Sequence, residues 1–274
     1  AQSLNRQAQA ILVANDRGGY TVPTDGLYPY QWNWDSAFAA FGFAQFNLPR
    51  AWTELETLVS GQWSNGMIPH ILFHRADPGY FPGPDVWGCD GPIASSGISQ
   101  PPVAASFARW IFETDPDSGR DRMVALYPRL LDWHRWFMTW RLDRGAVCIT
   151  HPWEAGRDNA PDWDGAMASI DPTGVGSYER RDTSHVNPDM RPTRYDYDRS
   201  LWLVHLGNRL GWAERLYDFA GLEMDDSVRA QVAAMQNTLF RTRKPDGLEP
   251  DLVAEAVGEV LQDSPWAKTL GDQT

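Results

Sequence analysis

The segment from His151 to Asp164, HPWEAGRDNAPDWD, carries the side chains with the clearest capacity for chemistry. It combines carboxylates with two tryptophans, and Gly156, Pro152 and Pro161 interrupt regular structure. A carboxyl group that is shielded from water keeps its proton at a higher pH and can then act as a general acid. The segment is therefore predicted to be a functional loop, and the alternative is a solvated acidic surface loop with tryptophan anchors.

Asp158 is the best candidate for such an acid. It lies mid-loop beside Gly156 and Asn159, and Trp153 and Trp163 are close enough in sequence to remove water from its carboxyl group. Hydrolysis of a glycoside requires one carboxyl to protonate the leaving oxygen and another to activate water or attack the sugar. The other carboxylates of the loop are expected to shape it rather than to react: Glu154, Asp162 and Asp164.

The segment LYPYQWNWDSAF, residues 27–38, carries groups that suit a sugar ligand. Tyr28 and Trp34 could stack on the faces of a sugar ring, and Asp35 could accept hydrogen bonds from its hydroxyls. In the alternative interpretation, Asp35 caps a helix and Trp34 belongs to the core with its aromatic neighbours Trp32 and Phe38. The two interpretations are compatible, because an Asp at a helix start projects toward the rim of a helical fold.

Two further loops contribute polar candidates. Gln100, in SGISQPP, offers both a donor and an acceptor, which suits a vicinal pair of hydroxyls. His70 and His74 have a spacing that could bind a metal ion on a helix, but Pro69 argues against a helix there. Both histidines are therefore expected to be structural, and neither a metal site nor a cofactor is predicted.

The segment DMRPTRYDYDR, residues 189–199, combines arginines and tyrosines with three aspartates. An arginine fork can bind a carboxylate through two parallel hydrogen bonds, which would suit an anionic part of a ligand. The alternative, given equal weight, is an ordinary cluster of surface ion pairs. The residues concerned are Arg191, Arg194, Tyr195 and Tyr197.

Helical periodicity recurs along the chain, whereas alternating strand patterns are scarce. The helix near residue 100 is expected to use Ser99 as its cap, with Pro101 and Pro102 in its first turn. Predicted helices cover about 3–15, 35–46, 50–62, 100–114, 120–140, 195–220, 226–241 and 249–262.

Three long irregular stretches, 16–34, 64–98 and 141–194, separate groups of these helices. They are rich in Gly, Pro, Trp, Tyr and Asp, and long loops inside a compact domain are usually functional. The pattern predicts an all-α fold, an α-helical barrel or toroid whose site lies at one rim. No linker divides the chain, so residues 1–274 are expected to form a single domain.

Composition narrows the range of partners. The net charge of −12 argues against nucleic acids and anionic membrane surfaces, and 14 tryptophans favour a ligand with flat faces such as a sugar. Cys89 and Cys148 have no metal-type spacing, no apolar run is long enough to span a membrane, and the first residues do not resemble a signal peptide. We therefore expect a cytoplasmic protein, and a homo-oligomer is compatible with this composition.

Four segments carry a resemblance to a known family: WNWDSAF, GQWSNGMIPH, SGISQPP and EAGRDNAPDWD. Their order and spacing resemble glycoside hydrolase family 63, in the inverting clan that also includes the trehalases. Within this family, the chain is most similar to the small bacterial mannosylglycerate and glucosylglycerate hydrolases. The resemblance covers about residues 4–220. It implies an (α/α)6 barrel that cleaves α-linked glucose or mannose from a small polar aglycone such as glycerate.

The resemblance also assigns roles to individual positions. Asp158 matches the general acid of the family, and Gly156 matches a loop position that contacts the substrate. Arg191 and Tyr197 match the positions that meet the aglycone. The positions that hold the sugar in the −1 subsite are matched by Tyr28, Trp34, Asp35, Tyr80 and Gln100.

The chain departs from the family pattern at its C-terminal end. The general base of the family is a Glu flanked by aromatic residues near the C-terminus, and residues 221–274 contain no such motif. Glu249, Glu255 and Glu259 lie in a plain amphipathic pattern, and the predicted helices are fewer than a full barrel contains. We therefore expect the barrel to be incomplete, with residues 1–274 alone inactive or very weak.

Other functions are also considered. A non-catalytic carbohydrate-binding helical protein would use the same aromatic walls, and its sugar binding would survive Asp158→Asn. A trehalase or an oligosaccharide α-glucosidase would belong to the same clan. A terpene cyclase is suggested by the pairs Gln31-Trp32 and Gln62-Trp63, but the chain has no DDxxD-like cluster.

Overall fold

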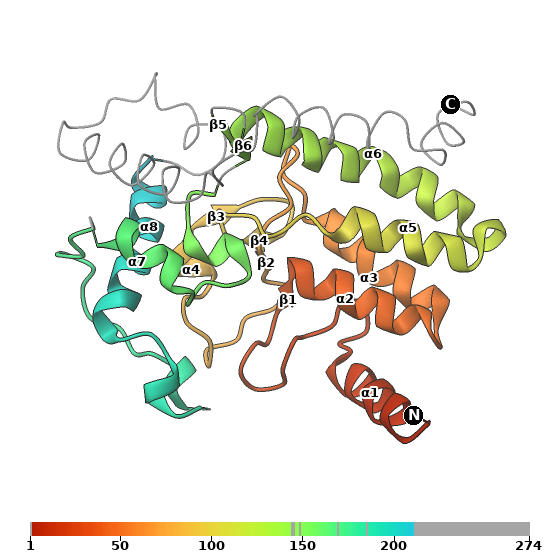
Figure 1. The fold of residues 1–274 in the computed structure, drawn as a ribbon, viewed down its shortest axis with the longest axis horizontal. Coiled ribbons are helices and arrows are strands. Elements are labelled where there is room, and N and C mark those ends of the chain that lie inside the picture. Colours follow the sequence, from red (N-terminus) through yellow and green to blue (C-terminus); the bar gives the residue numbers. More distant parts are fainter. Residues whose placement is uncertain (1, 144–145, 148, 169, 185, 211–274) are drawn as a thin grey trace.

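The computed structural model describes residues 2–143, 146–147, 149–168, 170–184 and 186–210. This part of the chain is rich in helix and has few strands, as the periodicity predicts (Figure 1). None of its helices is both long enough and apolar enough to cross a membrane. The helices are α1 (Gln2–Asn15), α2 (Asn33–Ala44), α3 (Leu48–Ser60), α4 (Pro84–Trp87), α5 (Ala104–Thr114), α6 (Pro116–Trp140), α7 (Asp164–Met167) and α8 (Arg194–Leu210).

Helices α2, α3, α5 and α6 form the main packed body of the molecule (Figure 1). Asn47 caps α3 by accepting a hydrogen bond from the backbone N–H of Arg50, at 3.2 Å, and Asp115 caps α6 in the same way. The apolar faces of these helices meet in one large core, where burial of the aromatic rings contributes most of the stabilisation. Its largest fully buried side chains include Trp52, Trp133, Trp136 and Phe43.

A small antiparallel sheet gathers the long loops beside this body. The strand order is β1 (Gln31–Trp32), β2 (Ile71–Leu72), β4 (Ala94–Ser95) and β3 (Cys89–Asp90), with Trp32 opposite Ile71. A separate pair consists of β5 (Leu142–Asp143) and β6 (Ala146–Val147). The loops at 16–34, 64–98 and 141–194 are therefore not wholly irregular, because short strands tie distant segments together.

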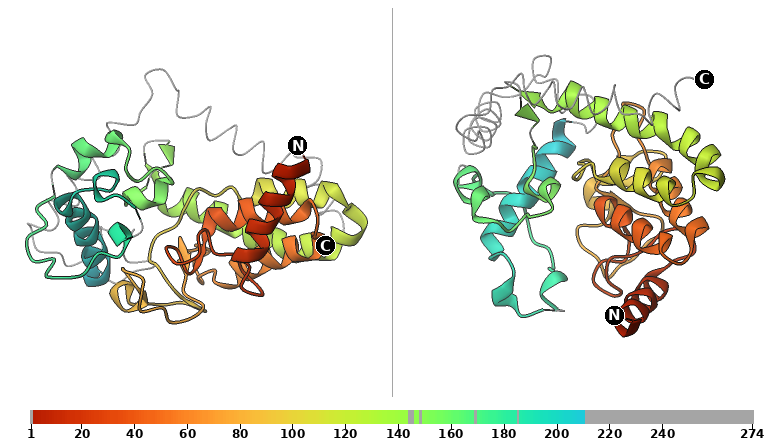
Figure 2. Two further views of the ribbon diagram at one scale, coloured as in Figure 1. Left: turned by 90° about the horizontal axis from the view of Figure 1, so that it is seen from below. Right: turned by 45° about the vertical axis from the view of Figure 1, so that its right-hand side comes forward.

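The described residues of 149–210 form an arm on the other side of the sheet. It holds the short 3-10 helices η1 (Pro152–Ala155), η2 (Pro161–Trp163), η3 (Asp182–Ser184) and η4 (Pro188–Met190), together with α7 and α8. Figure 2 shows α7 and α8 on the opposite side from α2 and α3, with the sheet and α4 between them. The arm has a smaller core of its own, around Trp163, Met167 and Leu203.

The predicted helix 100–114 is wrong at its start. Helix α5 begins at Ala104, and Ser99 does not cap it. The Ser99 hydroxyl instead donates to the carbonyl of Ile68, at 2.7 Å, and accepts from the ring N–H of Trp133, at 3.0 Å. Helix α6 begins four residues earlier than predicted because Asp115 caps it. The predicted helices 226–241 and 249–262, and the end of 195–220, lie outside the described residues.

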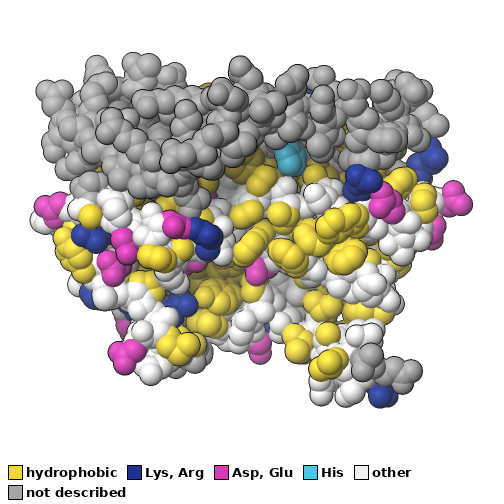
Figure 3. Space-filling view, in the orientation of Figure 1, with side chains coloured by type: hydrophobic (Ala, Val, Ile, Leu, Met, Phe, Trp, Pro, Cys, Tyr) yellow, Lys and Arg dark blue, Asp and Glu magenta, His cyan; other side chains and the backbone are white. Residues whose placement is uncertain are grey.

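Hydrophobic side chains gather on an exposed face of α2 and α5 (Figure 3), and several of them are aromatic. Phe38 and Trp110 are about half exposed, and the ring of Phe107 contacts both, with centroids 4.7 and 5.2 Å away. Trp34 meets Phe38 edge to face at 5.7 Å. Phe38 is therefore not a core residue. Its ring connects Trp34 to the neighbouring rings of Phe107 and Trp110.

Candidate functional site

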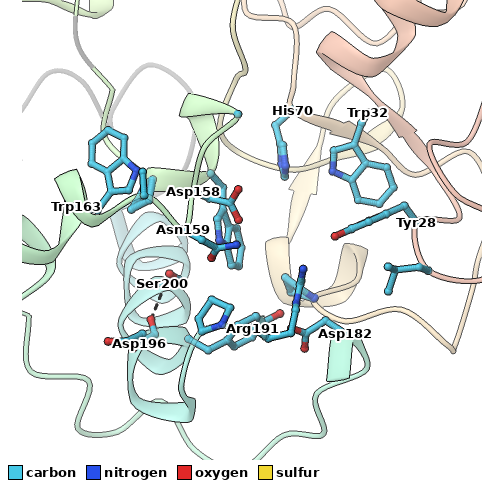
Figure 4. Close-up of a pocket in the computed structure, with 18 of the residues that line it drawn as sticks. Tyr28, Trp32, His70, Asp158, Asn159, Trp163, Asp182, Arg191, Asp196 and Ser200 are labelled. Carbon is cyan, nitrogen blue, oxygen red and sulfur yellow. Dashed lines mark hydrogen bonds and ion pairs between the residues drawn. The ribbon is translucent and has the colours of Figure 1, made fainter. Parts of the chain in front are cut away.

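A single cavity brings together all nine residues that the sequence singled out as site residues. Figure 4 labels three of them, Tyr28, Asp158 and Arg191. Its volume is about 740 Å³, within the usual range for small-ligand sites. One wall, called the helical wall, comes from the first turn of α2, the segment before it, the loop around Tyr80, and Gln100. The other, called the arm wall, comes from residues of the arm. The nine residues are Tyr28, Trp34, Asp35, Tyr80, Gln100, Gly156, Asp158, Arg191 and Tyr197.

The first turn of α2 positions Trp34 and Asp35. Trp32 occupies the N-cap position without a side-chain bond, so the predicted capping role of Asp35 is wrong. The backbone N–H of Trp34 instead donates to the side-chain oxygen of Gln100, at 3.1 Å. Asp35 is thereby left to face the cavity, where burial raises the pKa of its carboxyl group to about 6.

The loop of Asp158 lies directly against this wall. Helix η1 ends at Ala155 and is followed by Gly156, whose φ of +66° is the left-handed conformation that favours glycine. A Cβ atom on Gly156 would lie 2.6 Å from the ring of Trp34, so the close approach also requires glycine. Gly156 is thus needed for backbone shape and packing, in addition to lining the cavity.

Asp158 projects into the cavity, across from His70 and Tyr28 (Figure 4). Its side chain is accessible to solvent within the cavity, but the surrounding walls displace much of the bulk water. This desolvation raises its pKa, and the positive charge of Arg191 partly opposes the shift. The ring N–H of Trp163 donates to the carbonyl of Arg157, at 3.0 Å, and so helps to hold the loop. A carboxyl group in this setting can carry a proton to a ligand.

The other carboxylates of the loop differ in their surroundings. Glu154 is buried and ion-paired with Arg141, and Asp162 forms an ion pair with Arg157. These contacts shape the loop, as the sequence predicts for both residues. Asp164 differs, because it lines the cavity.

The arm contributes a cluster of arginines and tyrosines. Arg191 pairs with Asp182 at 2.9 Å, which holds the guanidinium group beside the cavity. Tyr197 is nearly buried under the guanidinium of Arg180, with 4.5 Å between the guanidinium carbon and the ring centroid, and burial raises the pKa of its hydroxyl. The sequence left open a ligand clamp or a cluster of ion pairs, and the structure shows ion pairs that border the cavity. Arg194 and Tyr195 do not line it.

Tyr80 completes the aromatic part of the first wall. It is half-buried, and its ring meets Trp32 edge to face at 5.4 Å and Tyr30 at 5.3 Å. Its hydroxyl has a raised pKa, chiefly because of burial. It is therefore a neutral hydrogen-bonding group over the physiological pH range.

Sequence reasoning missed several cavity residues, of which His70 is the most informative. Its ring is buried, and its Nδ1 atom has no hydrogen-bond partner within the described residues. Burial lowers its pKa to about 3, so the ring is neutral. Its place beside β2, which pairs with β1, is a tertiary signal that spacing does not reveal. The other missed lining residues include Trp32, Asn159, Asp182 and Asp196.

His74 takes the structural role that the sequence predicts. It stacks on Tyr20 with 4.2 Å between ring centroids, and its Nε2 atom is 2.7 Å from the side-chain oxygen of Gln31. Across the described ranges, no group of three or more His, Cys, Asp or Glu residues is arranged to hold a metal ion.

Comparison with known proteins gives a consistent result. Residues 28–241 match the family model described as mannosylglycerate hydrolase MGH1-like glycoside hydrolase domain. A mannosylglycerate hydrolase of Thermus thermophilus is 44% identical in an alignment of 267 positions, which covers 95% of this chain and 61% of that protein. A glucosylglycerate hydrolase of Mycolicibacterium hassiacum is 39% identical in an alignment of 256 positions, which covers 84% of this chain and 57% of that protein.

A solved structure is also similar. The crystal structure of a GH63 mannosylglycerate hydrolase from Thermus thermophilus, in complex with Tris and D-glycerate, matches with a TM-score of 0.76 and 41% identity. The match covers 96% of this chain and 66% of that chain. The same enzyme in complex with glucose matches with a TM-score of 0.69 and 39% identity, over 98% of this chain and 66% of that chain. The chain therefore spans only about three fifths of the length of these relatives.

Proposed function

Because the chain belongs to the MGH1-like family of glycoside hydrolases, within family 63, we propose that it carries the acid side of an enzyme that hydrolyses glycosides of glycerate. The observation that carries the proposal is the cavity in which Asp158 faces the Trp34 and Asp35 wall while Arg191 borders the same space. A related enzyme has been solved with D-glycerate and with glucose, the two kinds of group that such a substrate contains.

In the proposed reaction, Asp158 donates its proton to the glycosidic oxygen as the bond from that oxygen to the sugar carbon breaks. Glycerate leaves with this proton, and a water molecule adds to the opposite face of the sugar carbon with inversion. A second carboxylate must take the proton of that water. The raised pKa of Asp158 favours the protonated form that the first step needs.

The remaining site residues divide between the two parts of the substrate. Stacking on the aromatic wall and hydrogen bonds to hydroxyls would hold an α-linked mannose or glucose through Tyr28, Trp34, Asp35, Tyr80 and Gln100. Arg191 and Tyr197 would hold the glycerate carboxylate by a charge-assisted contact and a hydroxyl hydrogen bond. Gly156 would bring the acid loop close to the sugar.

We further propose that the described helices form part of an (α/α)6 barrel in one catalytic domain, with the cavity at its rim. The general base is not assigned to any described residue, and Glu249, Glu255 and Glu259 lie outside the described ranges. The cytoplasmic location and the homo-oligomer remain predictions from composition.

The test is an assay of the intact protein in which this sequence occurs, with mannosylglycerate and glucosylglycerate as substrates. NMR would identify the anomer released first, and the proposal expects inversion. Asp158→Asn should lower kcat by about 10²–10⁴-fold while sugar binding persists, because only proton transfer is lost. Undiminished turnover by Asp158→Asn would refute the role of Asp158.

Two other outcomes would contradict the proposal. Sugar binding without turnover by the intact protein would favour the carbohydrate-binding alternative. Robust hydrolysis by residues 1–274 alone would contradict the expectation that the base lies elsewhere.

A further inference from the structure

A buried ion pair lies directly behind the acid loop. A carboxylate oxygen of Glu154 is 2.7 Å from a guanidinium nitrogen of Arg141, and each side chain is only 1% exposed. Glu154 belongs to η1, two residues before Gly156 and four before Asp158. It does not line the cavity, so it is not positioned to touch a ligand.

Both carboxylate oxygens of Glu154 accept hydrogen bonds from other segments. The oxygen that faces Arg141 also accepts from the backbone N–H of Ser99, at 2.9 Å. The second oxygen accepts from the backbone N–H of Thr150, at 2.8 Å, and from its hydroxyl, at 3.3 Å. One carboxylate therefore joins the end of α6, the segment before α5 and the start of the acid loop.

The contact with Ser99 connects this carboxylate to the opposite wall of the cavity. Ser99 directly precedes Gln100, whose side-chain oxygen accepts from the backbone N–H of Trp34. Gly156 lies against the ring of Trp34. The acid loop is thus attached to the wall at two points, through Glu154 and through Gly156.

We propose that Glu154 is a positioning residue, whose carboxylate fixes the position of the Asp158 loop relative to the wall formed by Gln100 and Trp34. The inference rests on the proposed function, because it gives Glu154 the task of setting where the acid meets the glycosidic oxygen. Proton transfer needs heavy atoms within hydrogen-bond reach, so a small displacement of the loop slows the reaction steeply.

The test uses Glu154→Gln in the intact protein. This change keeps the size of the side chain, removes its charge, and places an amide NH2 group where one oxygen now accepts hydrogen bonds. Activity is compared on two substrates with the same sugar, the glycerate glycoside and the glycosyl fluoride. Fluoride leaves without a proton donor, so its hydrolysis does not depend on the placement of Asp158.

We expect Glu154→Gln to lower kcat for the glycerate glycoside by about 10–100-fold and to change kcat for the fluoride by less than about threefold. In the Asp158→Asn background, Glu154→Gln should add little further loss on the glycoside, because both changes act on the same step. An equal loss on both substrates, or full additivity, would overturn the inference.

Two additional variants make the outcome decisive. Asp115→Ala removes a helix cap that does not line the cavity, and it controls for lowered stability, because it should affect both substrates equally. Arg141→Lys keeps a positive charge beside Glu154 but loses the planar guanidinium group. It should therefore lower kcat more for the glycoside than for the fluoride, by a smaller factor than Glu154→Gln. This variant provides the test even if Glu154→Gln fails to fold. Equal losses on both substrates in Arg141→Lys would also contradict the inference.

The failure of this inference can be told apart from failure of the proposed function. If Asp158→Asn affects both substrates equally, the assignment of the general acid is wrong. If Asp158→Asn shows the difference and Glu154→Gln does not, only the positioning role is wrong.

Discussion

The two walls of the cavity are held in place by different forces. Behind the helical wall, the buried Glu54 accepts hydrogen bonds from Thr21, Gln31, Ser36 and Arg50, and the large aromatic core surrounds this network. The arm wall depends instead on ion pairs whose arginine side chains range from 10% exposed, at Arg180, to 50% exposed, at Arg194, with a smaller core beneath. Buried networks resist opening, whereas exposed ion pairs are weak and screened by salt.

This difference suits the two parts of the proposed substrate. A hexose ring has a fixed shape and many hydroxyls, so a rigid wall can distinguish it through well-placed partners. A carboxylate is recognised mainly through charge, which tolerates more movement and responds to ionic strength. The comparison therefore predicts that changes in the helical wall alter stability strongly, while changes in the arm mainly alter recognition of the aglycone.

The largest effect is expected for Glu54→Gln. This change removes the charge that faces Arg50 and leaves several buried donors without an acceptor. The free energy of unfolding should fall by about 3 kcal/mol, as for other broken buried ion pairs. Urea unfolding of the wild type and the variant would measure this loss. A loss below about 1 kcal/mol would mean that the helical wall does not depend on this network.

Asp35→Asn should remove the destabilisation that results from burying an ionised carboxylate in the helical wall. The folded-state pKa of Asp35 is about 6, above the ordinary 3.8. The folded protein therefore binds the Asp35 proton more tightly than the unfolded chain does, and this stabilises the fold fully below about pH 4. The stabilisation is lost as the pH rises through about 6. At pH 8, Asp35→Asn should therefore raise the free energy of unfolding by up to about 3 kcal/mol, at about 1.36 kcal/mol per unit. At a pH of about 3.5 it should have little effect.

Sugar affinity should respond to the same titration in the opposite sense. The ionised carboxylate of Asp35 accepts hydrogen bonds from two hydroxyls better than the protonated form, so affinity should weaken as the pH falls below about 6. Calorimetric titration with the sugar across a pH range of about 4–8 would test this, because the affinity should depend on pH in the wild type and not in Asp35→Asn. A pH-independent affinity in the wild type would contradict a role of Asp35 in sugar binding.

Arg191→Met should weaken recognition of the aglycone with little effect on the sugar. Loss of a charge-assisted contact corresponds to about 1.5–3 kcal/mol, or roughly 10–150-fold in kcat/KM for a glycerate glycoside. A glycoside of uncharged glycerol should lose far less. Kinetics with both substrates at low and high salt would measure this, and an equal loss on both would argue against a carboxylate clamp.

Arg194→Ala should have the smallest effect. Arg194 pairs with Asp198 at 3.1 Å and lies 3.7 Å from the ring centroid of Tyr178, but its side chain is half exposed and does not line the cavity. Exposed pairs of this kind contribute at most about 1 kcal/mol. Thermal unfolding should show a small shift that shrinks in high salt. A loss above about 2 kcal/mol would show that the arm is held more firmly than its exposure indicates.

Helix positions could largely be predicted from the sequence, because apolar periodicity and caps are local signals. Helices α1, α2 and α3 lie within two residues of their predicted bounds. The start of α5 was misplaced because Ser99 has the composition of a cap but binds Ile68 and Trp133, which are distant in sequence. A hydroxyl takes the partners that the packed structure offers, and spacing does not reveal them.

The candidate site was predicted with more detail than the fold alone would allow, because four motifs resembled those of a known family. The cavity residue His70 was nevertheless interpreted as only structural. Whether a buried ring faces a cavity depends on the pairing of β1 with β2, which joins segments about forty residues apart. The sequence also did not reveal that Arg191 pairs with Asp182 at the edge of the cavity, because Asp182 lies nine residues away in a separate short helix.

The sequence by itself determined the approximate positions of the longer described helices, which family the chain resembles, and that residues 151–164 concentrate carboxylates in one loop. Only the tertiary structure decided how those carboxylates differ. Glu154 is enclosed by Arg141, Ser99 and Thr150, whereas Asp158 faces the cavity with a raised pKa. The physical reason is that the charge state and contacts of a carboxyl group depend on the groups around it, and here those groups come from distant parts of the chain.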